Sequence, residues 1–276
     1  AYGNIGANFE HQGEYDKALI YLDKAYDLEL GFYGETHPII VKRSSTLGSV
    51  YGLKGNQDKA LLFKRKALAA SLKIFGKNHL ETARSYNNLG NHYVNVGQPT
   101  MAFEYIQKAE NSLNEAFGGV HPYYGAVAAN MANYFMVTNR PEQGLPYLEK
   151  GLEVMKTIFG DRHPETAFML SQMGQCYLEM GQEKEALSSV AEGVAALNMK
   201  GVDMENSEDK PYPFNQCSSP TRLLDLLKLK GNCYQRLAQG EARQGNLEKA
   251  VDSYLTAMAL IDSMRQSFTT EGSQKD

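Results

Sequence analysis

The chain has 276 residues, of which 42% are hydrophobic, and carries a net charge of −4 with an isoelectric point near 5.9. It has no basic stripe, which argues against direct nucleic-acid binding, and no run of about 18 apolar residues, which argues against a membrane span. Its three cysteines follow neither a disulfide framework nor a zinc motif. We therefore expect a cytoplasmic protein that needs no cofactor or metal.

The sequence repeats with a period of 42 residues. One series of small residues, each after an apolar residue, comprises Gly6, Gly48, Gly90, Ala132 and Gly174. Two further series keep the same step, one of glycines (Gly34, Gly76, Gly118, Gly160) and one of histidines (His37, His79, His121, His163). Such a period predicts one supersecondary unit that is copied and stacked, with an extended binding surface rather than one catalytic cleft.

Each repeat is predicted to be a helix, a tight turn and a second helix. In the second repeat, residues at helical spacing lie on both sides of a break at Gly55. Gly48 and Ala60 fall where the two helices would cross, and small side chains permit a close approach there. The corresponding turns in the five repeats hold Gly13, Gly55, Gly97, Asn139 and Gly181, which suit a left-handed helix cap.

The connectors between repeats read YGETHP, FGKNHL, FGGVHP and FGDRHP. Glycine ends one helix, and the histidine precedes the first turn of the next, where proline is well tolerated. Successive histidines would stand about 10 Å or more apart, whereas zinc needs ligands at about 2 Å. We therefore expect the histidines to cap or pack rather than to bind metal.

The pattern of small, aromatic and glycine residues in SYNNLGNHYVNVGQPTMAFEYIQKA, from Ser85 to Ala109, resembles the tetratricopeptide repeat. The 42-residue form with its FGxxHP junction resembles kinesin light chains and many bacterial tetratricopeptide proteins. The resemblance implies an all-α, right-handed superhelical solenoid of about six helix-turn-helix units. Five regular repeats would cover 1–198, and a long atypical helical pair would cover 221–268. Between them, the proline-containing acidic loop 199–220 is expected to be the most mobile internal segment.

The C-terminal unit resembles the last repeat of CHAT (caspase–HetF-associated with tetratricopeptide repeats) proteins. The residues that carry this resemblance are Leu260, Ile261, Asp262, Arg265, Ser267, Glu271, Gly272 and Ser273. It implies the recognition half of a caspase-like protease, with 269–276 as a tail leading to a further domain. The start, AYGNIG, enters mid-helix without a Met, so we expect that end to be cut as well. No catalytic motif occurs within the chain, and we expect no enzyme activity in it. The alternative is a kinesin-light-chain-like cargo or assembly adaptor with no protease.

In tetratricopeptide arrays the first helices line the concave face, which implies a candidate site for a protein or an extended peptide. The candidate peptide-binding residues are Lys42, Arg84, Asn88, Asn91, Asn95, Asn130, Asn133 and Gln175. An amide can pair with both the N–H and the C=O of a peptide backbone, and Arg84 or Lys42 can take a carboxylate. Two alternatives stay open: the asparagines can instead stabilise neighbouring helices, and the cations can belong to a solvated face. The oligomeric state is not predicted.

Overall fold

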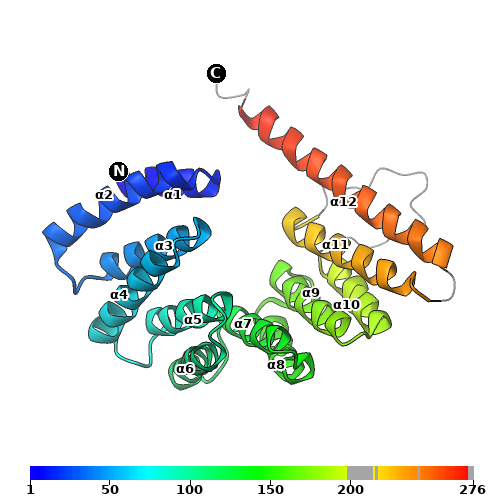
Figure 1. Cartoon of the computed structure of the whole chain (residues 1–276), viewed down its shortest axis with the longest axis horizontal. Helices are drawn as coiled ribbons and strands as arrows, with labels where there is room; N and C mark the ends of the chain where they lie inside the picture. Colours follow the sequence, from blue (N-terminus) through cyan, green and yellow to red (C-terminus); the bar gives the residue numbers. More distant parts are fainter. Residues whose placement is uncertain (198–213, 215–216, 241–242, 273–276) are drawn as a thin grey trace. The chain divides into compact units, whose positions relative to one another are not determined.

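The computed structural model describes residues 1–197, 214, 217–240 and 243–272, and within them the fold is all-helical. The helices run α1 (Tyr2–His11), α2 (Tyr15–Tyr33), α3 (Pro38–Leu53), α4 (Gln57–Phe75), α5 (Leu80–Asn95), α6 (Pro99–Phe117), α7 (Tyr124–Val137), the 3₁₀ helix η1 (Pro141–Gln143), α8 (Leu145–Phe159), α9 (Pro164–Glu179), α10 (Glu183–Ala196), α11 (Pro220–Leu237) and α12 (Arg243–Gly272) (Figure 1). The predicted helical pairs are confirmed. The chain divides into two compact units, unit 1 (Ala1–Tyr134) and unit 2 (Phe135–Asp276).

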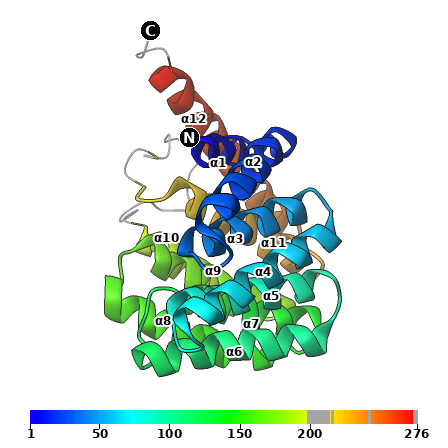
Figure 2. The same ribbon diagram turned by 90° about the vertical axis from the view of Figure 1, so that its left-hand side faces the viewer.

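Unit 1 is built from the pairs α1/α2, α3/α4 and α5/α6, followed by most of α7. Figure 2 shows these pairs stacked in chain order, from α1 and α2 at the top to α6 at the bottom. Each second helix packs against its own partner, α2 also packs against α3 and α4 against α5, and α3 contacts α5. The first helices of neighbouring pairs therefore lie close enough for their side chains to form one continuous face.

Small residues set the helix crossings, as the sequence predicted. A β-carbon on Gly90 of α5 would lie 2.4 Å from Cγ1 of Ile106 and 3.0 Å from the Ile106 backbone nitrogen on α6. The first distance is shorter than real β-carbon contacts, and the second is tight against backbone that cannot rotate away, so glycine lets α5 and α6 approach this closely without a shift. At the turn after α7, Asn139 adopts the left-handed conformation with φ of 58°, as the glycines do at the other predicted turns.

The connector histidines cap the helices that follow them. The imidazole Nδ1 accepts the backbone N–H of the second residue downstream, from Ile39 to His37 at 3.2 Å, Glu81 to His79 at 3.2 Å, Tyr123 to His121 at 3.0 Å and Glu165 to His163 at 3.1 Å. Each ring also lies against the aromatic residue that ends the preceding helix, with centroid distances of 4.2–4.5 Å. These contacts use one ring nitrogen and one ring face, and they confirm the capping role.

Unit 2 contains η1 and the helices α8 to α12. Its core is formed by α9, α10 and α11, with Leu170, Val190 and Leu226 among its buried residues. Helix α11 begins at Pro220, and α12 extends to Gly272, past the expected end at Phe268. Of the loop 199–220, only Phe214 and 217–220 lie within the described residues, and 273–276 lie outside them. Among the described helices, none combines the length and apolar character that crossing a membrane requires.

Candidate functional site

The predicted site residues lie on the first helices of the pairs. Lys42 is on α3, and Arg84 is on α5. The five predicted asparagines, which we call the amide face, are Asn88, Asn91 and Asn95 on α5 and Asn130 and Asn133 on α7. All of these belong to unit 1, whereas Gln175 is on α9 in unit 2.

One asparagine of the amide face is paired with a residue that the sequence did not single out. Asn87 of α5 is buried, and its Oδ1 accepts a hydrogen bond from Asn130 Nδ2 at 3.0 Å. Its own Nδ2 donates to Tyr123 Oη at 3.0 Å. Asn130 therefore joins α7 to α5 and has a structural role. A signal was present, because the corresponding positions in the repeats hold Ser45, Ala129 and Ser171 rather than an amide.

The other four asparagines of the amide face are unpaired. Asn88, Asn91 and Asn133 are half-buried and Asn95 is exposed, and none makes a side-chain hydrogen bond to any described residue. Within the described part of the chain, Ser44 Oγ is the one side-chain polar atom that is both inaccessible to solvent and without a hydrogen-bond partner. The four amides therefore remain in contact with solvent, and their donors and acceptors are available to a ligand.

Arg84 lies on α5 with three residues of the amide face, and Lys42 is its counterpart on α3. Arg84 Nη1 lies 3.3 Å from Glu81 Oε1, and its guanidinium sits 5.2 Å from the centre of the Tyr123 ring. Burial and then the Arg84 charge lower the pKa of His121. Lys42 is exposed and makes no ion pair with a described residue. Because exposed ion pairs contribute at most about 1 kcal/mol, Arg84 can exchange Glu81 for a carboxylate brought by a ligand.

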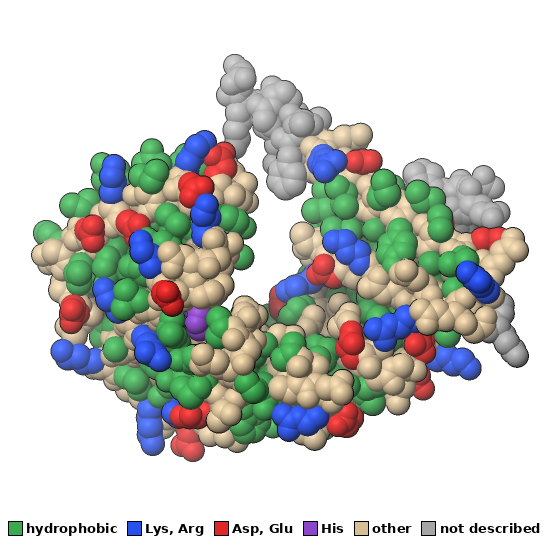
Figure 3. Space-filling model, in the orientation of Figure 1, with side chains coloured by type: hydrophobic (Ala, Val, Ile, Leu, Met, Phe, Trp, Pro, Cys, Tyr) green, Lys and Arg blue, Asp and Glu red, His purple; other side chains and the backbone are tan. Residues whose placement is uncertain are grey.

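The surface of unit 1 carries no single-sign patch on the side seen in Figure 3, where acidic and basic side chains are interspersed. An amide-rich face with isolated cations is suited to backbone recognition and a few charged contacts, not to a polyanion such as nucleic acid.

Comparisons with known proteins agree with this architecture. Family models described as tetratricopeptide repeat match residues 1–73 and 123–198, and a second such model matches 82–123. The chain belongs to the tetratricopeptide repeat family. A search of curated proteins gives no match.

Solved structures share the fold of this tetratricopeptide array. The crystal structure of BtubC (BKLC) from P. vanneervenii aligns with a TM-score of 0.63 at 18% identity, covering 88% of each chain. Nearly identical TPR-like repeats from Podosopora anserina, assigned as a kinesin light chain, align with a TM-score of 0.60 at 16% identity, covering 73% of this chain and 96% of theirs. At these identities the similarity shows the fold alone.

In unit 2 of the tetratricopeptide array, the polar residue at the position of Asn91 and Asn133 is paired. Gln175 Nε2 donates to Glu179 Oε1 at 2.8 Å, and Glu179 lies 3.8 Å from Arg236 Nη2 on α11. Arg236 also donates to the Leu178 carbonyl. Gln175 therefore has the same position in the repeat as Asn91 and Asn133, but its side-chain amide is not free to bind a ligand.

A second contact, made by Arg222, joins α11 to α9 near the start of both helices. Arg222 Nη2 lies 3.6 Å from Glu165 Oε1, and its guanidinium stacks 4.1 Å from the centre of the Phe168 ring. These contacts fasten the last helix pair to the preceding one.

The two buried thiols of unit 2 are suited to packing. Burial raises the pKa of Cys176 and of Cys233 to about 11 each. Both remain protonated near neutral pH, and a protonated thiol is a poor nucleophile. Cys176 Sγ instead donates to the Pro141 carbonyl at 3.0 Å.

Proposed function

We propose that this tetratricopeptide array is a protein-interaction scaffold that binds an extended segment of a partner protein on the amide face of unit 1. The observation that carries the proposal is the set of unpaired, solvent-reachable amides of Asn88, Asn91 and Asn133. Each amide offers two donors and an acceptor. Two neighbouring helices thus present both donors and acceptors to a bound peptide. Such a surface recognises the main chain of the peptide rather than its side chains.

The basic residues would add a charged contact at the edge of this face. Arg84 is oriented by Glu81 and Tyr123, and Lys42 carries an exposed charge on the preceding first helix. An acidic group of the bound segment would lie near Arg84. A charge-assisted hydrogen bond of this kind contributes about 1.5–3 kcal/mol, against about 0.5–1.5 kcal/mol for a neutral one.

The test begins with a ligand selected without bias, by phage display of random peptides against the whole chain. Asn91→Ala combined with Asn133→Ala should weaken the selected peptides roughly tenfold or more, because two hydrogen bonds are lost. Arg84→Glu should weaken acidic peptides and reduce the salt dependence of their binding.

The matched control is Asn111→Ala on α6, which removes an exposed asparagine from a second helix of the same unit. It should leave the affinity unchanged. If the amide-face variants bind as well as the control, and substitution of Arg236 or Arg243 weakens binding instead, the binding surface would lie in the C-terminal unit.

For the biological setting we propose the recognition half of a CHAT-type caspase-like protease. The support is the resemblance of the sequence run from Leu260 to Ser273 to the last repeat of CHAT proteins. Within that run, Leu260 is buried in the core of unit 2, and Asp262 and Arg265 are exposed. Ser273 of that run lies outside the described residues.

The second candidate setting is a cargo or assembly adaptor without a protease, which the similarity to kinesin-light-chain repeats favours. The coding sequence after Asp276 distinguishes the two. A caspase-like domain with its Cys and His supports the first setting, and a stop codon or a coiled coil supports the second.

A further inference from the structure

A surface cavity of about 150 Å³ lies in unit 1, where α2, α3, α4 and the connector between α2 and α3 meet. Two of its lining residues are buried, Tyr26 of α2 and Ile40 of α3. The others are Glu35 and Thr36 of the connector and Lys66, Ala69, Ala70 and Lys73 of α4. At about 30 Å³ for each water-sized group, the cavity has room for roughly five or six non-hydrogen atoms.

The next junction along the array shows which contact this cavity lacks. There Ser112 of α6 donates through its Oγ to the backbone carbonyl of Lys77 at 2.6 Å. One period earlier, the corresponding residues are Ala70 and Glu35, both in the lining of the cavity. Ala70 has no hydroxyl, and no described residue donates a hydrogen bond to the Glu35 carbonyl. The cavity therefore lies where a side chain makes a hydrogen bond in the following repeat, and it leaves that acceptor unpaired.

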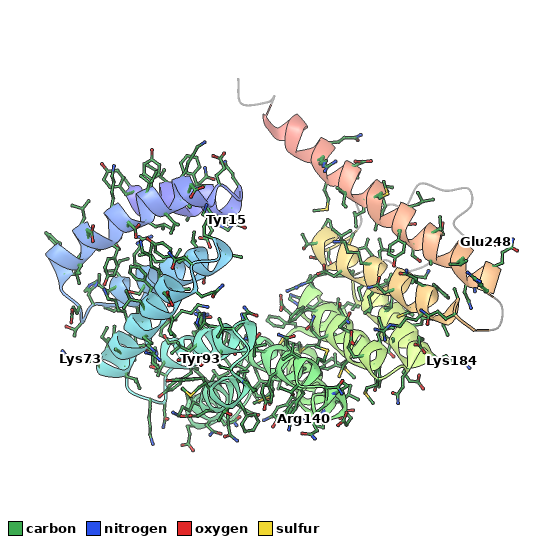
Figure 4. The ribbon with its side chains drawn as sticks, in the orientation of Figure 1. Tyr15, Lys73, Tyr93, Arg140, Lys184 and Glu248 are labelled. Carbon is green, nitrogen blue, oxygen red and sulfur yellow. The ribbon has the colours of Figure 1, made fainter. Side chains whose placement is uncertain are left out.

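Two lysines of α4 bring positive charge to the cavity. Lys66 Nζ donates to Tyr26 Oη at 3.3 Å and lies 5.2 Å from the centre of the Tyr26 ring, so its ammonium is held beside the buried part of the lining. Lys73, labelled in Figure 4, lies about two helical turns further along α4 and makes no hydrogen bond or ion pair with a described residue. Glu35 is the one acidic residue of the lining. Two positive charges and one negative charge leave the lining with a net charge of +1, which favours a monoanion.

We propose that this cavity binds a small carboxylic acid that has a hydrogen-bond donor on the adjacent carbon, namely a short 2-hydroxy or 2-amino acid. Its carboxylate pairs with the ammonium groups of Lys66 and Lys73. Its hydroxyl or ammonium group donates to the Glu35 carbonyl, as Ser112 Oγ does to the corresponding carbonyl at the next junction. Its carbon chain lies against Ile40. The site is built from α2, α3 and α4 and uses no residue of the amide face, so it can be tested independently of peptide binding.

The experiment follows the methyl signals of Ile40 and Ala70 in the whole chain by NMR at pH 7 and constant ionic strength. The probes share one three-carbon skeleton: sodium lactate and alanine carry a carboxylate and a donor, sodium propionate lacks the donor, and lactamide lacks the charge. Lactate or alanine should shift both signals along a saturable curve, with a dissociation constant in the millimolar range. Propionate should bind roughly tenfold more weakly, because one hydrogen bond is lost, and lactamide should not saturate.

The two acids with a donor identify the source of that donor. Saturation with lactate and not with alanine assigns a 2-hydroxy acid. Saturation with alanine assigns a 2-amino acid, whose ammonium group also pairs with the Glu35 carboxylate, and Glu35→Gln should then weaken alanine binding. The absence of saturation with both acids would overturn the proposal, as would propionate or lactamide binding as tightly as lactate and alanine.

A small substitution tests the position of the ligand. Ala70→Ser introduces the hydroxyl that Ser112 has in the next repeat, which can donate to the Glu35 carbonyl in place of the ligand. It should leave the protein folded and weaken binding of the preferred acid roughly tenfold or more. Unchanged affinity in Ala70→Ser would overturn the proposal.

A pair of lysine variants separates the cavity from general charge attraction. Lys73→Gln should weaken binding roughly tenfold or more, because it removes a charge-assisted hydrogen bond. The matched control is Lys59→Gln: Lys59 is an exposed lysine of the same helix, its Nζ lies 4.8 Å from the centre of the Tyr51 ring, and it does not line the cavity. Equal affinities of Lys73→Gln and Lys59→Gln would show that the lysines of α4 do not bind the ligand at this site.

Discussion

The first-helix faces of the two units carry polar residues at the same repeat positions but use them differently. In unit 1, Asn91 and Asn133 leave their amides unpaired. In unit 2, Gln175 donates to Glu179, which in turn lies beside Arg236. The difference shows that a repeat position does not determine whether an amide is available. Gln175 is paired because its own helix carries Glu179 four residues later, where α5 carries Asn95 and α7 carries Val137.

The largest expected effect is on stability, at the helix crossings of the two units. Gly90 lies at the crossing of α5 with α6 in unit 1, and Gly174 is its counterpart on α9 in unit 2. Gly90→Ala should destabilise the protein by about 2–3 kcal/mol, because the new β-carbon meets the Ile106 backbone nitrogen at 3.0 Å as well as its side chain. Gly174→Ala should cost less, because the closest atom is the terminal Cδ2 of Leu229, at 2.8 Å, which can rotate away. Urea denaturation measures both, and equal costs would show that the crossing in unit 1 is not tighter than that in unit 2.

The next effect concerns Lys64, whose counterparts in unit 2 are the aliphatic Leu148 and Val190. Lys64→Leu should stabilise the protein by about 2–3 kcal/mol at pH 7, because it removes an unpaired buried charge.

The pH dependence of that gain has a defined sign. The folded pKa of Lys64, about 8, lies below the usual value of 10.5, so between these values the unfolded chain binds more protons and the stability of the wild type rises with pH. The advantage of Lys64→Leu should therefore be complete below pH 8 and shrink as the pH approaches 10.5. Denaturation curves at several pH values check this, with Lys66→Leu as the exposed control. If Lys64→Leu stabilised the protein equally at every pH, the interpretation of Lys64 as a buried, unpaired cation would be wrong.

A smaller effect separates the paired amide of unit 1 from its free neighbour. Asn87→Ala should cost about 1–2 kcal/mol, because it removes the bonds to Asn130 and Tyr123. Asn88→Ala, the adjacent residue, should change the stability by less than about 0.5 kcal/mol. Thermal unfolding of the two variants makes the comparison, and equal losses would mean that Asn88 also has a structural partner.

The smallest effect is expected in unit 2. Glu179→Ala removes the exposed partner of Gln175 and Arg236 and should cost less than about 1 kcal/mol. A larger loss in urea denaturation would indicate that this polar network, rather than the apolar core, holds α9 to α11.

The fold could be predicted from the sequence because its determinants are local and repeated. Gly90, Asn139 and His163 each act on a neighbouring turn or crossing, and the period places them in register. The site could be predicted only in part. Asn130 pairs with Asn87, and Lys64 has no acidic side chain beside it. Both facts depend on which residue the adjacent helix contributes, and a repeat pattern does not predict that residue. The repeat pattern also does not predict the division of the chain into two units after Tyr134.

The most direct test of the proposed function observes the side-chain amides themselves. The ¹H–¹⁵N signals of the asparagine and glutamine side chains are followed while a peptide selected by phage display is titrated into the whole chain. Binding through the unpaired amides of unit 1 predicts large shifts for Asn88, Asn91 and Asn133 and small ones for Asn87 and Gln175, whose hydrogen bonds are already made within the protein. Shifts confined to Gln175 and the rest of unit 2, with the amide face unchanged, would contradict it.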